Sequence, residues 1–194
     1  MVWFNQIVFW IPFLVAVFIL IKIWRKLTLQ GQVEERTLKR GVILVVALFV
    51  VRDILRIIFI YFSMKADPLG SYLLPGQGTN YFSSVLWSTF EPLILGILVG
   101  ILLTLVAILI KRYTAKPWFE TFEIWIIFLT SFLVGFPGVF VLLLASFLLM
   151  IIWQIFRKAE RVMLAPFLLL VCLAQLVLNN FQFYQNFLVR LHLI

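Results

Sequence analysis

The sequence predicts an all-α membrane protein, a polytopic bundle of about six transmembrane helices with both the N-terminus and the C-terminus outside. Hydrophobic residues make up 64% of the 194 residues and charged residues only 12%, which is more apolar than a soluble core requires. Apolar runs of membrane-spanning length alternate with short polar segments. The basic residues cluster in every second polar segment, as in cytoplasmic loops, so the net charge of +8 indicates membrane topology and excludes a nucleic-acid partner.

The first three predicted spans follow from where the charges and turn residues lie. Residues 3–24 form an uncleaved first helix, because the basic residues follow this apolar run instead of preceding it. Residues 41–64 return outward. The segment 65–85 is rich in Gly, Pro and Asn, which predicts an irregular outside loop, and residues 86–110 then span inward to a second basic cluster.

The long apolar stretch that follows is divided at the sequence GFPG, residues 135–138. The two resulting spans, 118–135 and 138–156, each match a hydrocarbon core of about 30 Å. This division also returns the third basic cluster, RKAER at residues 157–161, to the cytoplasmic side. A last span over residues 163–181 leads out again, so the whole chain forms one integral membrane domain.

Three charges lie near the middle of the second span, where each costs about 3 kcal/mol. At about 100° per residue, Arg52, Asp53 and Arg56 share one face of this helix. Glu91 lies in the outer part of the third span, so we expect Asp53 to pair with Arg52 and Glu91 to reach Arg56. Two interpretations stay open: a neutral network that locks the helices in register, or an outward-facing polar cavity whose arginines bind an anionic lipid head group.

Other chemistry is sparse in the sequence, and no catalytic residue is identified. The single histidine, His192, lies two residues from the end, and the lone Cys172 lies in an apolar run, so we expect no metal site and no cofactor. The patch NNFQFYQN, residues 179–186, is typical of an interfacial aromatic belt.

Two short stretches resemble the prolipoprotein diacylglyceryl transferases of the bacterial cytoplasmic membrane, which move diacylglycerol from phosphatidylglycerol to a lipoprotein cysteine. In GFPGVF, residues Gly135, Gly138 and Phe140 match the G-x-x-G-x-F frame of that family's outside turn. In ILRIIFIYF, Arg56 matches the arginine of the family's G-A-R segment. The resemblance implies a phospholipid-binding fold in a bacterial cytoplasmic membrane, with an organellar inner membrane as the alternative.

The same comparison implies that the family's full catalytic set is absent. Phe136 and Val139 stand where the family has an arginine and an asparagine, and no acidic residue follows the turn. The end of the chain also resembles the type IV prepilin peptidases, but Asp53 and Glu123 are the only candidates for the carboxylate pair of that chemistry, and the topology separates them. Whether the chain is an enzyme stays open.

Three functions are therefore compared. The first is a transferase-like protein that binds anionic phospholipid at Arg52, Asp53, Arg56 and Glu91. The second is a non-catalytic structural subunit of a multi-subunit membrane complex, whose aromatic residues contact partner helices. The third, a transporter subunit, is less favoured because only GFPG interrupts a span.

Overall fold

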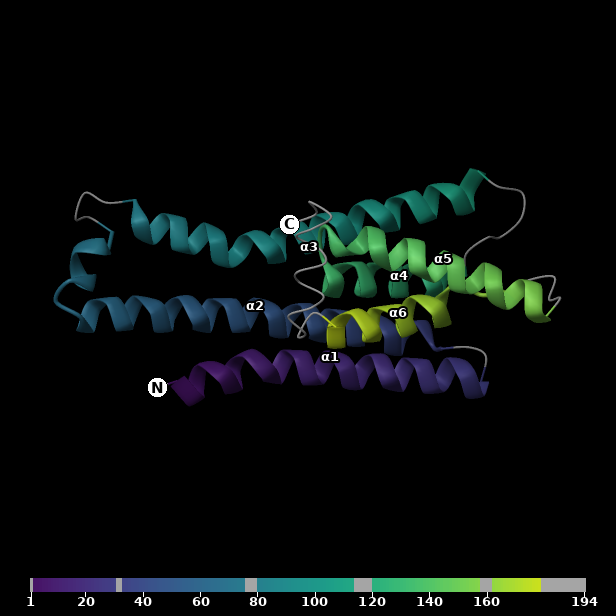
Figure 1. The fold of residues 1–194 in the computed structure, drawn as a ribbon, viewed down its shortest axis with the longest axis horizontal. Helices are drawn as coiled ribbons and strands as arrows, with labels where there is room; N and C mark the ends of the chain where they lie inside the picture. Colours follow the sequence, from purple (N-terminus) through teal and green to yellow (C-terminus); the bar gives the residue numbers. More distant parts are fainter. Residues whose placement is uncertain (1, 31–32, 76–79, 114–119, 158–161, 179–194) are drawn as a thin grey trace.

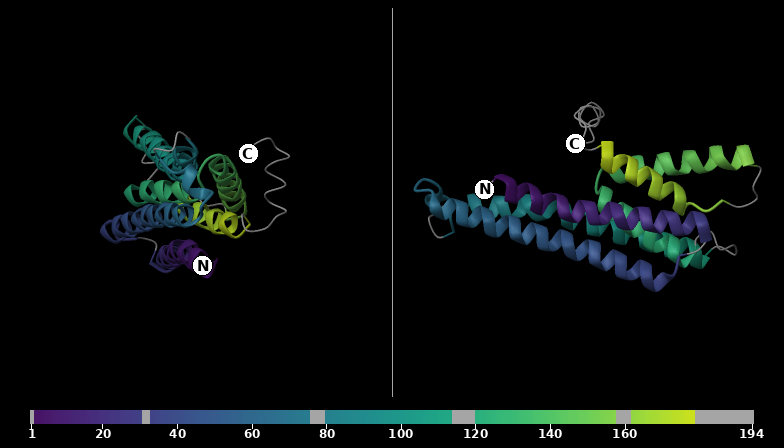
Figure 2. Two further views of the ribbon diagram at one scale, coloured as in Figure 1. Left: turned by 90° about the vertical axis from the view of Figure 1, so that its left-hand side faces the viewer. Right: turned by 90° about the horizontal axis from the view of Figure 1, so that it is seen from below.

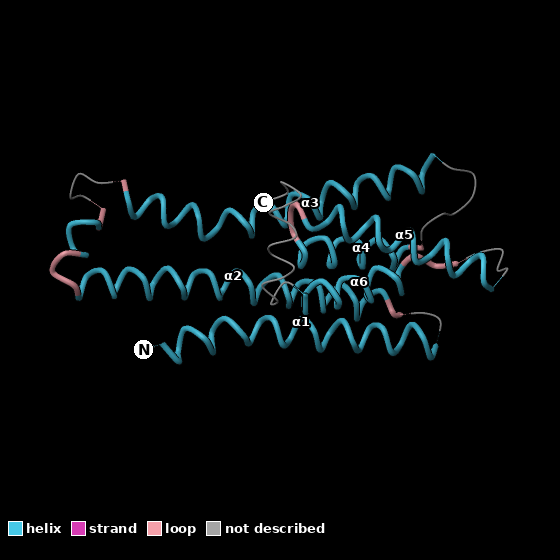
Figure 3. Tube along the Cα trace, in the orientation of Figure 1, coloured by secondary structure: helices cyan, strands magenta, loops and turns pink. Residues whose placement is uncertain are grey.

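The computed structural model describes residues 2–30, 33–75, 80–113, 120–157 and 162–178. Within these ranges every regular element is a helix, so the all-α prediction is confirmed (Figure 3). The elements are α1 (Val2–Gln30), α2 (Glu35–Ala66), the 3-10 helix η1 (Gly70–Leu73), α3 (Tyr81–Tyr113), α4 (Thr121–Val134), α5 (Gly138–Arg157) and α6 (Ala165–Leu178). The sequence patch 179–186 and His192 lie outside the described residues.

The helices differ widely in length. α1, α2 and α3 contain 29, 32 and 33 residues and continue past the spans predicted from the sequence. α4 contains 14 residues, or about 21 Å at 1.5 Å per residue, which is shorter than the span predicted for it; the described part of α6 also contains 14 residues, and the end of its predicted span lies outside the described residues. By length and composition, two of the described helices, α3 and α5, can cross a membrane.

The segment 65–85 is a correction to the sequence prediction. The sequence predicts an irregular loop over these residues, but α2 continues to Ala66, α3 already begins at Tyr81, and η1 lies between them. Polar side chains within this segment bond to nearby backbone carbonyls instead of disrupting the helices. The Ser84 hydroxyl, for example, donates to the carbonyl of Asn80 at 3.2 Å, which is compatible with the first turn of α3.

The short helices α4 and α6 lie at the centre of the bundle. α4 contacts α2, α3, α5 and α6, and α6 also contacts α1. Viewed along the long axis, α1 and α3 lie at opposite edges (Figure 2). The largest fully buried apolar side chains are Leu20, Leu38, Ile126, Leu129, Leu142, Leu168 and Leu169. Because α4, α5 and α6 occupy only part of the bundle's length, one end of α2 and one end of α3 extend beyond them (Figure 1).

Two glycines allow α3 and α4 to approach closely. A Cβ atom added at Gly96 would lie 3.0 Å from the backbone oxygen of Phe132, and one added at Gly100 would lie 3.1 Å from the ring of Phe128. Small residues four apart are the usual means by which membrane helices pack backbone against backbone. The α3–α4 contact is the most extensive helix pair in the described structure.

Gly96→Ala should lower the free energy of unfolding by about 1 kcal/mol, because an overpacking cost of about 1–3 kcal/mol exceeds the gain of about 0.5–1 kcal/mol from replacing a helical glycine. Gly41→Ala is the matched control, since a Cβ there would meet Ile19 at an ordinary 3.4 Å, and it should stabilise the fold. Unfolding in detergent micelles, followed by circular dichroism, measures both. Shifts of the same sign would contradict a tight contact at Gly96.

Basic side chains collect at one end of the bundle. That end contains the last turns of α1, α3 and α5 and the first turns of α2 (Figure 1). The basic residues on these turns are Lys22, Arg25, Lys26, Arg36, Lys39, Arg40, Lys111, Arg112 and Arg157. Between this end and the opposite one, large apolar side chains are exposed on every long helix, for example Phe18 at 66% and Leu102 at 61%.

Candidate functional site

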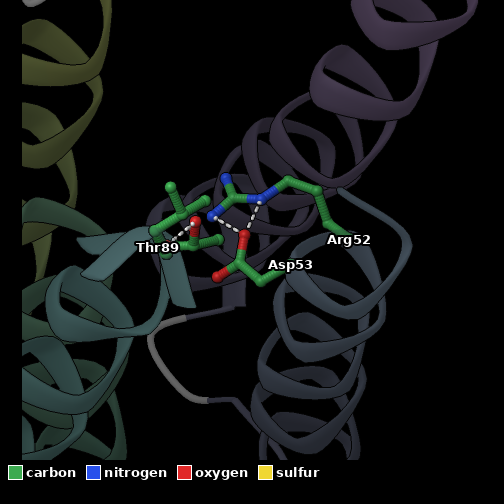
Figure 4. A network of polar contacts seen from close by, with 4 residues as sticks. Arg52, Asp53 and Thr89 are labelled. Carbon is green, nitrogen blue, oxygen red and sulfur yellow. Dashed lines mark hydrogen bonds and ion pairs between the residues drawn. The ribbon is translucent and has the colours of Figure 1, made fainter. Parts of the chain in front are cut away.

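The ion pair between Arg52 and Asp53 lies on α2 and faces α3 (Figure 4). Nε of Arg52 donates to Oδ1 of Asp53 at 2.7 Å, and Nη2 of Arg52 lies 2.7 Å from the same oxygen. Consecutive residues on a helix do not face each other, so the pair forms because the long arginine side chain folds back along α2. The expected contact between Asp53 and Arg52 is therefore observed.

The Arg52–Asp53 ion pair is energetically costly because it is buried. The side chain of Asp53 is 1% exposed and that of Arg52 is 20% exposed. The guanidinium of Arg52 stacks over Phe49, with 4.6 Å between Cζ and the ring centre, and Phe49 contacts the edge of Phe132 on α4. Among the described residues, Oδ2 of Asp53 has no hydrogen-bond partner, which costs about 1–3 kcal/mol.

Arg56 lies one turn beyond the Arg52–Asp53 pair on α2. It is on the face of the helix that is buried nearer the start of α2. At about 100° per residue, its direction is within about 20° of that of Val45, which is fully buried. Residues at the end of α4 line the pocket with Arg52, and α4 ends at Val134, so Arg56, one turn further along α2, lies past the end of α4. Arg56 is exposed, and within the described part of the chain it makes no ion pair.

Glu91 does not join this cluster, which corrects the expected contact with Arg56. Thr89 on α3 is buried and faces the Arg52–Asp53 pair (Figure 4). Glu91 is two residues further along, about 200° around the helix, so it points to the opposite side. It is exposed and forms no ion pair with any described residue. The depth of Glu91 along α3 is predictable from the sequence, but the rotation of α3 is set by the packing of Gly96 and Gly100.

A small pocket connects Arg52 to the turn between α4 and α5. Its volume is about 170 Å³. It is lined by residues of α2, α3, the end of α4 and the α4–α5 turn: Phe49, Arg52, Pro92, Leu93, Leu95, Phe132, Leu133, Val134, Gly135 and Phe136. Most small-molecule sites measure about 300–1,000 Å³, so this pocket fits one small polar group and not a whole lipid.

The α4–α5 turn and the start of α5 contain the three residues that match the transferase frame. Gly135 ends α4 with φ of 66°, a left-handed conformation that favours glycine. Gly138 begins α5, and a Cβ there would approach Val134 at 2.8 Å, so this position also requires a small residue. Phe140 is 59% exposed and contacts the ring of Phe136. The glycines therefore have structural roles, whatever the turn binds.

Glu123 is a buried polar residue whose main contact the sequence did not indicate. It is 2% exposed, and Oε1 accepts hydrogen bonds from the backbone N–H groups of Leu164 at 3.0 Å and Ala165 at 3.3 Å, where α6 begins. Oε2 accepts from the N–H of Glu120 at 2.9 Å, at the start of α4. The favourable dipole position of Glu123 in α4 is visible in the sequence. Its contact with α6 depends on tertiary packing, 41 residues away.

The described residues contain no group of three or more His, Cys, Asp or Glu side chains that could hold a metal ion. The fold and site define a helical protein with an apolar exterior, a basic end and an arginine cluster beside a glycine-rich turn. Comparison of this chain with protein-family models, curated proteins and solved structures found no match.

Proposed function

We propose that this chain is an integral membrane protein of the bacterial cytoplasmic membrane, with its basic end in the cytoplasm and about six spans. Support comes from the exposed apolar surface of the long helices, because a helix that is apolar all round requires lipid or a protein partner around it. The collection of four basic helix ends at one end of the bundle agrees with the positive-inside pattern. In this orientation both termini lie outside.

In this membrane, the protein binds the anionic head group of a phospholipid with Arg56, supported by Arg52. The observation that carries this function is Arg56 itself, an exposed cation that lacks an ion pair among the described residues and lies past the end of α4. Asp53 neutralises Arg52 and holds its guanidinium at the pocket, so the cluster keeps one positive charge in excess. A phosphate accepts bidentate hydrogen bonds from such a guanidinium.

The depth of Arg56 is compatible with a lipid phosphate. Arg40 marks the basic end of α2, and Arg56 is about 24 Å further along at 1.5 Å per residue. With a hydrocarbon core of about 30 Å, Arg56 then lies about 6 Å below the outer boundary, a distance that an arginine side chain spans by snorkelling. Arg52 lies one turn deeper and reaches the pocket beside Gly135 instead.

This function keeps the phospholipid chemistry implied by the transferase resemblance and omits the transfer step. Of the matching residues Gly135, Gly138 and Phe140, which lie in the α4–α5 turn and at the start of α5, Gly135 lines the pocket with Arg52, which agrees with a lipid site at this position. Phe136 occupies the position of the family's arginine and also lines the pocket with an apolar ring. The chain is therefore proposed as a binding protein of transferase type.

Arg56→Ala should reduce the retention of phosphatidylglycerol by about tenfold to a hundredfold, the value of a charged hydrogen bond of about 1.5–3 kcal/mol. Native mass spectrometry of the protein, released from nanodiscs that contain phosphatidylglycerol, measures the retained lipid. Lys65→Ala removes an exposed charge from the end of the same helix and is the matched control. Circular dichroism checks the fold. Equal retention by the wild type and Arg56→Ala would refute the proposed function.

A second candidate, the non-catalytic subunit of a membrane complex, is favoured by Glu91. This carboxylate lies on the outer side of α3 beside exposed apolar residues, including Trp87 at 63% and Leu98 at 56%. A carboxylate that faces lipid is costly, and a basic residue on a partner helix would neutralise it. If the subunit function holds, Glu91→Gln should weaken co-purification of partner proteins and leave lipid retention unchanged.

A further inference from the structure

A second concave surface lies on α1, at the basic end of the bundle and away from the Arg52 pocket. Its volume is about 340 Å³, and the described residues that line it are Phe18, Ile21, Lys22, Arg25, Lys26 and Leu29. These residues are spaced at intervals of three and four, so they form one stripe along the helix. We refer to this stripe as the α1 basic face.

The α1 basic face points away from the protein. The buried residues of the same part of α1 are Leu20, Ile23 and Leu27, which pack into the hydrophobic core. Phe18 is 66% exposed, Ile21 is 43% exposed and Leu29 is 76% exposed, although all three are apolar. The stripe is therefore available to whatever surrounds the bundle.

The three cations of this face are not neutralised by the described protein. Lys22, Arg25 and Lys26 form no ion pair within the described residues. Residues three and four apart are neighbours on a helix, so these like charges repel one another. An anion bound between them would relieve this repulsion.

The order of residues along the stripe matches the structure of a phospholipid. Phe18 and Ile21 lie nearer the middle of α1, and the three cations lie between them and the end of the helix at Gln30. Acyl chains contact apolar residues at depth, while phosphates lie at the level of basic residues near helix ends. A soluble anion would use only the cations and would leave Phe18 and Ile21 uncovered.

We propose that the α1 basic face binds an acidic phospholipid of the cytoplasmic leaflet, with its phosphate between Lys22, Arg25 and Lys26 and its acyl chains along Phe18 and Ile21. This site is distinct from the Arg56 site, because the two lie on different helices and near opposite ends of the predicted bilayer core. It requires the membrane orientation proposed above but no lipid at Arg56.

The test compares phosphatidylglycerol retained by the full chain after release from nanodiscs of phosphatidylcholine and phosphatidylglycerol. Juxtamembrane cations contribute about 1 kcal/mol each, so Arg25→Gln should lose affinity at this site about fivefold and the triple variant K22Q/R25Q/K26Q about a hundredfold. The single variant keeps the test valid if the triple variant inserts poorly. Phe18→Ser should also weaken lipid retention, while inorganic phosphate should not displace the lipid.

The matched control is the triple variant R36Q/R40Q/R112Q, which removes the same charge from the same end of the bundle. These three arginines are exposed and lie on α2 and α3. Lys39 is not used, because its side-chain hydrogen bond lowers the pKa of Glu35 and the two form an ion pair. Equal losses in both triple variants would mean that only the overall charge matters and would overturn the proposal. Displacement by inorganic phosphate would also overturn it, in favour of a simple anion site.

An Arg56→Ala background separates this site from the proposed function. If Arg25→Gln reduces retention by the same factor with and without Arg56, the α1 site is independent, even if Arg56 itself binds no lipid. If Arg25→Gln has no effect in either background, the α1 site does not exist, and the Arg56 result is unaffected.

Discussion

Replacing Glu123 with alanine should destabilise the protein by about 3–5 kcal/mol, because two buried backbone donors and a helix cap lose their acceptor together. The N–H groups of Leu164 and Ala165 begin α6 and have Glu123 Oε1 as their acceptor, and both residues are buried. The N–H of Glu120 loses its bond to Oε2 at the start of α4. Because Glu123, Leu164 and Ala165 are buried in the protein interior, no bulk water is present to replace the bonds between them, so the loss lies at the upper end of typical single substitutions.

Glu123→Gln is the matched control for this prediction. Its carboxamide oxygen keeps an acceptor for the α6 donors, but its NH₂ group cannot accept from Glu120. We expect a loss of about 1–2 kcal/mol, which is intermediate between the wild type and Glu123→Ala. Unfolding in detergent micelles, followed by circular dichroism, gives both values. Similar losses in the two variants would show that the negative charge matters, and not the number of acceptors.

The sequence predicts the all-α fold class well because long apolar helices have a strong local signal. Apolar runs and basic clusters identify an all-α chain with no reference to tertiary contacts. The lengths of the helices were less predictable. Ser83 and Ser84 are polar, yet α3 begins at Tyr81, because the Ser84 side chain bonds to the backbone carbonyl of Asn80, just before the helix. Composition alone does not reveal that compensation.

Placing the site residues required information that one sequence does not contain. Arg52 and Asp53 are adjacent, so their contact was predictable from their positions in α2. Glu91 belongs to another helix, and its direction depends on how α3 rotates to bring Gly96 against Phe132. Rotating a helix by about 100° about its own axis moves the inward-facing position by one residue, but it leaves the depth of each residue along the axis unchanged. The depth of a residue is therefore easier to predict than the direction of its side chain. The same reason explains why the contact of Glu123 with α6 was missed.

Asp53→Ala should destabilise the protein by about 3–5 kcal/mol, because it leaves the partly buried guanidinium of Arg52 without its counter-ion. Arg52→Ala should cost less, since the stranded carboxylate of Asp53 can take up a proton, while an arginine in a protein cannot lose one. The double variant Arg52→Met/Asp53→Leu should be close to the wild type, because replacing a buried ion pair by apolar residues is often neutral. A double-mutant cycle of unfolding free energies measures this asymmetry, and equal losses in the two single variants would contradict it.

The same variants separate a register lock from a lipid site. If the ion pair only locks the helices, Asp53→Ala lowers stability and leaves lipid retention unchanged. If Arg52 supports Arg56 in binding an anion, the release of Arg52 from Asp53 adds a second available cation at the pocket. Asp53→Ala should then retain more phosphatidylglycerol than the wild type, while it unfolds more easily. Lower stability together with higher lipid retention in Asp53→Ala is expected only if Arg52 belongs to an anion-binding site.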